Sequence, residues 1–309
     1  MNEQENLCVL CPRRCRAARP RSLKNFTGKV PGVCSSPRNP VLARAALHMW
    51  EEPVISGERG SGTVFFSGCN LKCVFCQNYG ISTENRGEEI SVERLKEIYR
   101  ELISAGAHNI NLVTPAHYSD AVIESLSGEK LPVPVVWNSN GYDSVEIIRS
   151  LKDKVDIFLP DMKYASNELA ARYSSAPDYF EVASQAVKAM YEQIGPFRFD
   201  DDGMLKSGVV IRHLILPGQI ENSLKVIDFV RENFKAGEVL FSLMRQYLPC
   251  GRVSDKEFPE LNRRVSEEEY KIVEDALFAS GIEDGFVQDA ESASQVYIPP
   301  FDGSGVIKD

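Results

Sequence analysis

The sequence predicts an α/β protein: a partial barrel of six strand–helix units, residues 61–309, after a small Cys-rich N-terminal module, residues 1–60. Short β-branched or aromatic runs recur six times from residue 63, and segments with apolar residues at helical spacing separate them. Seven of the eight cysteines precede residue 77, which distinguishes the N-terminal part from the rest of the chain. The expected strands are Thr63–Ser67, Asn109–Thr114, Val133–Asn138, Asp156–Leu159, Val209–Leu216 and Val239–Met244.

The segments between these runs are expected to be helices. Ser91–Ala107 carries apolar residues on one face, and a second helix is expected from Ser266, where Glu269 completes a capping-box pattern. Strands alternating with helices indicate parallel pairing through right-handed crossovers. Six units are too few for a closed eight-stranded barrel, which leaves an open partial barrel or a doubly wound sheet. In both folds the functional site lies at the carboxyl ends of the strands.

Composition narrows the class of protein. No apolar run approaches the roughly 18 residues of a membrane-spanning helix, and the N-terminus lacks the pattern of a signal peptide. We therefore expect a cytoplasmic protein that is not bound to a membrane. The net charge of −9 disfavours general nucleic-acid binding, although residues 13–29 form a basic stretch that is suited to an acidic partner.

The most informative motif follows the first expected strand, where Cys69, Cys73 and Cys76 are spaced Cys-x3-Cys-x2-Cys. Three thiolates on one tight loop can hold three irons of a 4Fe-4S cluster and leave the fourth iron open, whereas a structural cluster takes four cysteines. Structural zinc sites also take four ligands as a rule. The motif therefore predicts a cluster with one free coordination position.

This motif, with Phe75 at its aromatic position, resembles the signature of the radical S-adenosylmethionine (SAM) superfamily. The resemblance implies a partial barrel and a 4Fe-4S cluster whose open iron binds SAM. It also implies a reducing partner such as flavodoxin or ferredoxin. Reductive cleavage of SAM would then yield a 5′-deoxyadenosyl radical that abstracts hydrogen from a substrate. The whole chain is most similar to uncharacterised cytosolic relatives of the glycyl-radical-enzyme (pyruvate formate-lyase) activating enzymes.

The same resemblance suggests which residues bind SAM. Trp137-Asn-Ser-Asn-Gly141 and Asp161-Met-Lys163 are similar to segments of the activating enzymes that lie beside SAM. The second strand ends in Leu112-Val-Thr-Pro115, where the superfamily usually has a Gly-Gly-Glu-like turn, so the acidic residue of that turn is missing. His213 is expected to face the helices. The candidates are Phe75, Thr114, Asn138, Ser139, Asn140, Asp161, Lys163 and Arg212.

Four further cysteines, Cys8, Cys11, Cys15 and Cys34, form a complete ligand set before the barrel. Their spacing suits either one zinc ion in a closed tetrahedral shell or an auxiliary iron–sulfur cluster. Cys250 follows the last expected strand and is interpreted as a buried small residue, a ligand or a hydrogen donor.

These observations predict a radical SAM oxidoreductase that abstracts hydrogen from a protein or peptide, as activating enzymes do. A barrel with little C-terminal covering would admit a peptide loop. One alternative is radical modification of a small molecule or a nucleic acid. Another is a non-catalytic metal-binding protein that interacts with partners.

Overall fold

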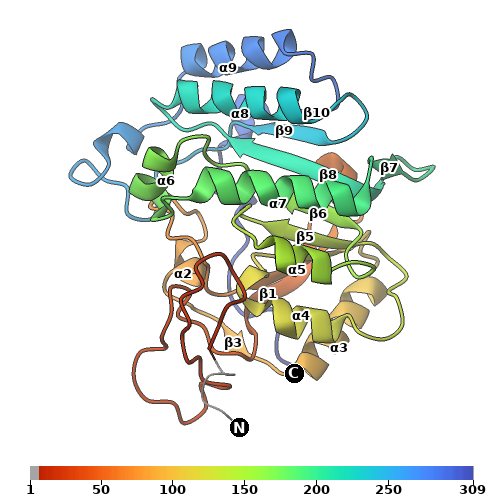
Figure 1. Cartoon of the computed structure of the whole chain (residues 1–309). Coiled ribbons are helices and arrows are strands. Elements are labelled where there is room, and N and C mark those ends of the chain that lie inside the picture. Colours follow the sequence, from red (N-terminus) through yellow and green to blue (C-terminus); the bar gives the residue numbers. More distant parts are fainter. Residues whose placement is uncertain (1–6, 309) are drawn as a thin grey trace.

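The computed structural model describes residues 7–308 and is built around one sheet (Figure 1). The strand order is β10-β9-β8-β6-β5-β4-β2-β1-β3, and β7 pairs with β8 off this path. All neighbours from β10 to β2 are parallel, whereas β1 is antiparallel to both β2 and β3. The strands are β1 (Val41–His48), β2 (Ser61–Phe66), β3 (Glu88–Glu89), β4 (Ile110–Val113), β5 (Val135–Ser139), β6 (Ile157–Pro160), β7 (Arg198–Phe199), β8 (Leu205–Leu214), β9 (Leu240–Met244) and β10 (Gly285–Val287).

The longer helices pack along the outer face of this sheet (Figure 1), whereas the short helix at Pro53–Ser56 packs Ile55 against its inner face. Their starts follow local chemistry: the Ser91 hydroxyl caps α3, and Ser266 with Glu269 forms the expected capping box of α9. The helices are α1 (Pro53–Ser56), α2 (Tyr79–Ser82), α3 (Val92–Ser104), α4 (Ser119–Ser125), α5 (Val145–Ser150), α6 (Asn167–Ser174), α7 (Tyr179–Ile194), α8 (Ile220–Asn233) and α9 (Glu267–Ala279).

The six expected strands are confirmed as β2, β4, β5, β6, β8 and β9. These strands lie side by side in chain order, so no reversal of strand order marks a doubly wound sheet, and the partial barrel is the fold observed. Within the expected N-terminal module, residues 41–48 form β1. The short strands β3, β7 and β10 were not predicted.

The N-terminal segment attaches to the barrel through β1 and through side chains. Residues 8–40 are irregular and lie beside α2 and β3 (Figure 1). The buried Arg19 guanidinium donates to the carbonyl oxygens of Ser36, Pro37 and His117, while Asn85 Nδ2 donates to Ser35 O at 2.6 Å. These contacts connect residues 8–40 to the loops that follow β2 and β4.

The C-terminal segment returns across the carboxyl ends of the strands. It leaves the sheet at Gln288, whose N–H donates to Leu243 O at 3.1 Å, and reaches β1 again where Gly303 N donates to Ala43 O at 2.9 Å. We call residues 289–299, between these two anchors, the strap. Across residues 7–308, none of the helices combines the length and the apolar character that crossing a membrane requires.

Candidate functional site

The loop that carries Cys69, Cys73 and Cys76 follows β2 at the carboxyl edge of the sheet, and neighbours hold it from several sides. Gly68 has a φ of +84°, and a Cβ there would overlap the Ser36 hydroxyl, so glycine is required at this turn. Arg13 Nε donates to Asn70 O at 2.8 Å, and Val74 N donates to Tyr173 O at 2.8 Å. The backbone of the loop is therefore held by a side chain of the N-terminal segment and by the backbone of α6.

Each of the three thiols accepts a hydrogen bond from a side chain outside the motif. Asn140 Nδ2 lies 3.3 Å from Cys69 Sγ, Ser174 Oγ lies 3.0 Å from Cys73 Sγ, and Ser82 Oγ lies 3.2 Å from Cys76 Sγ. Such donors stabilise sulfur in its thiolate form, the form that binds iron. The donor set therefore fits a cluster.

Burial, together with the charge of the neighbouring thiols, raises the pKa of Cys69 to about 12 and that of Cys76 to about 11. Thiols in this environment need nearby positive charge to ionise, and bound iron supplies it. Within residues 7–308, no three His, Cys, Asp or Glu side chains are arranged around a single metal ion. A 4Fe-4S cluster takes each thiolate on a different iron, so its ligands do not converge on one point.

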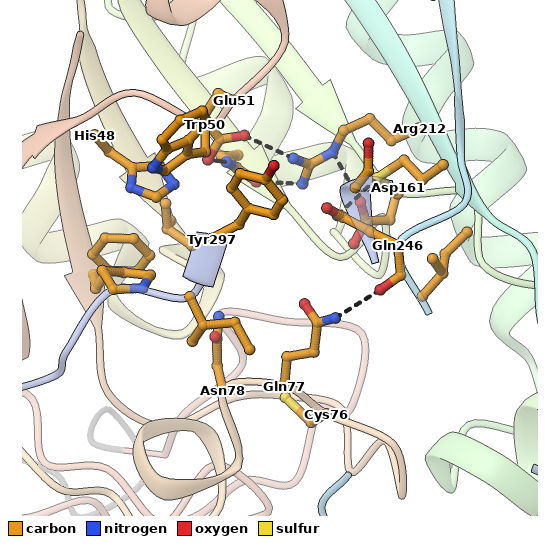
Figure 2. Close-up of a pocket in the computed structure, with 18 of the residues that line it drawn as sticks. His48, Trp50, Glu51, Cys76, Gln77, Asn78, Asp161, Arg212, Gln246 and Tyr297 are labelled. Carbon is orange, nitrogen blue, oxygen red and sulfur yellow. Dashed lines mark hydrogen bonds and ion pairs between the residues drawn. The ribbon is translucent and has the colours of Figure 1, made fainter. Parts of the chain in front are cut away.

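A pocket of about 230 Å³ opens beside this loop. The loop forms one side with Cys76, Gln77 and Asn78, while a charged side and an aromatic side face each other above it (Figure 2). Its lining residues are His48, Trp50, Glu51, Phe65, Cys73, Phe75, Cys76, Gln77, Asn78, Val113, Asn138, Asp161, Lys163, Arg212, Leu214, Met244, Gln246, Ser292, Ser294, Tyr297, Ile298 and Pro299.

The charged side is a network centred on Arg212. Its guanidinium donates from Nε to Asp161 Oδ1 at 3.0 Å, from Nη1 to Glu51 Oε2 at 3.0 Å and from Nη2 to Asn138 Oδ1 at 2.7 Å. Lys163 Nζ binds the other oxygen of Asp161 at 2.6 Å. Burial alone would raise the pKa of Asp161, but Lys163 and Arg212 outweigh it and hold that pKa below its usual range.

Of the eleven residues predicted to hold the cluster or SAM, seven line the pocket and four do not. Among the four, Asn140 contacts Cys69 instead, and the Ser139 hydroxyl accepts a hydrogen bond from Gly141 N at 3.2 Å within a turn. Thr114 has a φ of +60°, an unusual conformation for a β-branched residue, at the end of β4. The lining residues are Cys73, Phe75, Cys76, Asn138, Asp161, Lys163 and Arg212, and the others are Cys69, Thr114, Ser139 and Asn140.

His213, the next residue after Arg212, points to the other face of β8. It is fully buried, with Nδ1 at 2.7 Å from Met162 O and Nε2 at 2.9 Å from the Ser223 hydroxyl of α8. Burial lowers its pKa to about 4, so it is a neutral packing residue. This is the orientation that strand alternation predicts.

Two groups of lining residues were missed at the sequence level. His48, Trp50 and Glu51 come from the end of β1 and the loop after it, and Trp50 contacts Tyr297 of the strap with ring centroids 4.8 Å apart. The strap contradicts the expected lack of C-terminal covering, because Ser292–Pro299 contribute five lining residues. The pattern of the C-terminal sequence gives no sign that it folds back over the strand ends.

The four N-terminal cysteines share one neighbourhood. The Cys8–Ala17 turn is closed by backbone hydrogen bonds, and an added Cβ on Gly32, two residues before Cys34, would lie 3.4 Å from Cys15 Sγ. Burial raises the pKa of Cys11 to about 12, and the charges of Cys34, Cys8 and Cys15 add to this shift. A second metal site at these thiols stays a prediction.

Cys250 packs on the cluster loop, its thiol donating to Phe75 O at 3.0 Å.

Comparison with known proteins agrees with this geometry. A family model described as the radical SAM superfamily matches residues 63–230. An uncharacterised protein of Methanocaldococcus jannaschii is 33% identical over 232 residues, covering 72% of this chain. The chain spans 62% of that relative's length.

Two solved structures are similar at low identity. Spore photoproduct lyase, in a mutant form with a dinucleoside spore photoproduct, aligns with a TM-score of 0.50 at 11% identity, covering 87% of this chain and 88% of that one. A domain of a pyruvate-formate lyase-activating enzyme from Bacteroides vulgatus aligns with a TM-score of 0.39 at 13% identity, covering 57% and 91%. The match over residues 63–230 identifies the family: the chain belongs to the radical SAM superfamily.

Proposed function

We propose that this radical SAM enzyme holds its 4Fe-4S cluster on Cys69, Cys73 and Cys76 and abstracts hydrogen from a polypeptide, as activating enzymes do. The observation that carries the proposal is the shared pocket, in which Cys73 and Cys76 lie opposite the Asp161–Lys163–Arg212 network. When bound, the cluster supplies the electron that cleaves SAM into methionine and a 5′-deoxyadenosyl radical.

The chain's own residues prepare the site for that chemistry. Asn140, Ser174 and Ser82 donate to the three sulfur atoms and fix their directions. Lys163 and Arg212 offer positive charge for the carboxylate of SAM, while Asn138 and Asp161 offer groups for its ribose. All four come from the ends of β5, β6 and β8, which are rigid supports.

The strap supports a polypeptide as the hydrogen donor. A cavity of about 230 Å³ is smaller than the roughly 300–1,000 Å³ of ordinary ligand pockets, so SAM and a second molecule require the strap to move. The strap is itself a polypeptide whose side chains enter the mouth of the pocket. We infer that a segment of a partner protein enters the same mouth when the strap moves away.

The electron donor and the second metal complete the proposal. Exposed basic residues near the Cys-rich turn suit an acidic carrier such as flavodoxin or ferredoxin, and the best placed are Arg16, Arg21, Lys24 and Lys29. We also propose a zinc ion or an auxiliary cluster for Cys8, Cys11, Cys15 and Cys34, because four thiols lie in one neighbourhood. The described side chains do not converge on a single metal ion, so a zinc ion requires these thiols to move closer together.

The test of the substrate class uses an extract of cells that express the protein, filtered into fractions above and below about 10 kDa. The reconstituted enzyme receives SAM, dithionite and one fraction, and 5′-deoxyadenosine is measured. We expect the large fraction to stimulate its formation and protease treatment of that fraction to abolish the stimulation. Stimulation by the small fraction alone would favour a metabolite, and stimulation sensitive to nuclease but not to protease would favour a nucleic acid.

A further inference from the structure

Arg13 of the N-terminal segment reaches across to the barrel at the cluster loop. Its Nε donates to Asn70 O at 2.8 Å, its Nη1 donates to Ser175 O, and its Nη2 donates to Ser174 O at 3.3 Å. The guanidinium also lies over the ring of Tyr142, 5.1 Å from the ring centroid. Arg13 therefore joins three segments that are far apart in the chain: the Cys-rich turn, the cluster loop and the end of α6.

The turn that carries Arg13 is closed by its own backbone. Arg14 N donates to Cys11 O and Arg16 N donates to Cys8 O, each at 3.0 Å. Arg13 is half-buried in this turn, whereas the two following arginines have backbone φ angles of +39° and +51°. The turn is thus a shaped support that presents Arg13 to the barrel.

The end of α6 that Arg13 holds carries the hydrogen-bond donor to one cluster thiol. Ser174 is the last residue of α6, and its hydroxyl donates to Cys73 Sγ at 3.0 Å. Tyr164 OH lies 2.7 Å from the same hydroxyl oxygen, so it donates there when Ser174 donates to the thiol. The Ser174 carbonyl oxygen accepts from Arg13 and from Lys72 N, the latter at 3.2 Å. The direction of this donor therefore depends on a helix end that Arg13 ties to the cluster loop.

The contact of Arg13 with Asn70 leads to a second thiol. Asn140 Nδ2 donates to Asn70 Oδ1 at 2.8 Å and lies 3.3 Å from Cys69 Sγ. Asn70 Nδ2 in turn donates to Tyr142 O at 2.7 Å. Because Arg13 binds the backbone of Asn70 and stacks on Tyr142, it also supports the donor to Cys69.

The charge of Arg13 has no carboxylate partner among residues 7–308, where its partners are carbonyl oxygens and an aromatic ring. The proposed cluster is negatively charged, since three thiolates outweigh the charge of its oxidised core. Reduction by one electron adds a further negative charge. Positive charge and hydrogen bonds near the sulfur atoms therefore stabilise the reduced form more than the oxidised form.

We propose that Arg13 is a positioning residue that makes the cluster easier to reduce. It holds the end of α6 against the cluster loop in the arrangement in which Ser174 donates to Cys73. One electron from the reductant enters the cluster, and hydrogen bonds to the more negative sulfur atoms become stronger. The inference rests on the proposed cluster site, and it holds for any hydrogen donor and for any metal bound near the Cys-rich turn.

The test is a redox titration of the anaerobically reconstituted full-length protein without SAM, with mediators, in which electron paramagnetic resonance measures the reduced cluster. The proteins are wild type, R13Q, R13K, S174A and R13Q/S174A. The matched control is R14Q, which removes an equal charge from the next residue, an exposed arginine whose Nη2 binds Glu146 Oε1 at 3.1 Å. Iron content, sulfide content and melting temperature are compared first.

At the potential where wild type is half reduced, we expect the ratio of reduced to oxidised cluster to be about tenfold lower in R13Q. For one electron this is a shift of about 59 mV to more negative potential. S174A should shift in the same direction, and R13Q/S174A should shift by less than the sum of the single shifts, because Arg13 acts partly through Ser174. R13K, which keeps the charge without the planar fork, should recover part of the shift, and R14Q should match wild type.

Three results would each overturn the assignment: no shift in R13Q, equal shifts in R13Q and R14Q, or fully additive shifts in the double variant. A wild type that assembles no cluster would instead contradict the proposed function, so the two failures are distinguishable.

Discussion

Single residues set the charge of the pocket, and Arg212 is the one that connects the most strands. It joins carboxylates and an amide from the β1 loop, β5 and β6, so its removal would leave Glu51 without its cation and Asp161 with Lys163 alone. Its direction was predictable, because alternation along a strand sends Arg212 and His213 to opposite faces. Glu51 was not predictable, because no local pattern shows that the loop after β1 enters the barrel.

Asp143 provides a stability test at the same scale. It follows β5 and is buried, with neither carboxylate oxygen hydrogen-bonded to the described residues. Burial raises its pKa to about 6, from an ordinary value of 3.8. Between these two values the folded state keeps a proton that the unfolded state releases, so the free energy of unfolding falls as pH rises from about 4 to 6, by about 3 kcal/mol.

The D143N substitution should remove this pH dependence. We expect the free energy of unfolding of D143N, relative to wild type, to rise by about 3 kcal/mol between pH 4 and pH 7 and to stay level above that. Urea unfolding of both proteins at a series of pH values measures the difference. A difference that does not change with pH would show that Asp143 is ionised in the folded protein.

At the scale of elements, the strap is the part least fixed to the rest of the fold. Among the described atoms of residues 289–299, every hydrogen bond stays within the strap, and side-chain packing such as Trp50 on Tyr297 holds it over the pocket. Segments with few external hydrogen bonds open at low free-energy cost. Its C-terminal anchor is stronger, because Ala45 N donates to Ser304 O and Val306 is fully buried.

A substitution at Gly305 tests the C-terminal anchor of the strap directly. It has a φ of +72°, and a Cβ there would overlap Ala45 O, so G305A should loosen the anchor by about 1–3 kcal/mol. We expect chymotrypsin to cleave after Tyr297 at least about fivefold faster in G305A than in wild type. G303A is the matched control, since Gly303 has a φ of +79° with open space around it. Equal cleavage of G305A and G303A would mean that the anchor does not govern the strap.

The sequence predicted the elements whose apolar residues recur at a regular spacing. It did not predict the segments whose position depends on contacts with residues far along the chain. The six parallel strands, the helix within residues 91–107 and the capping box of α9 are local patterns, and each was found. The segment between β1 and β2, with α1, and the strap are short, irregular pieces whose places depend on packing against residues far along the chain. They supply about a third of the pocket lining, so the cysteine side and most of the charged side were predicted, whereas Glu51 and the aromatic side were not.

At the scale of the whole molecule, the basic N-terminal segment lies next to the cluster loop, because Arg13 binds Asn70. The variant R16S/R21S/K24S/K29S should therefore be reduced more slowly by flavodoxin, with a weaker dependence on salt, and normally by dithionite. The matched control K225S/K235S/K256S/K271S removes four exposed lysines from the C-terminal half. Stopped-flow reduction at two ionic strengths measures both. Equal slowing in the two variants would place the donor's docking surface elsewhere.

The central claim is that Cys69, Cys73 and Cys76 hold the cluster that cleaves SAM. The most direct measurement compares wild type, a variant with these three residues changed to Ala, and one with Cys8, Cys11, Cys15 and Cys34 changed to Ser, after anaerobic reconstitution. Iron, sulfide, zinc and 5′-deoxyadenosine formed from SAM with dithionite are quantified for each. We expect wild type and the four-cysteine variant to form 5′-deoxyadenosine and the Cys69/Cys73/Cys76 variant to form none. A Cys69/Cys73/Cys76 variant that still cleaves SAM would contradict the account.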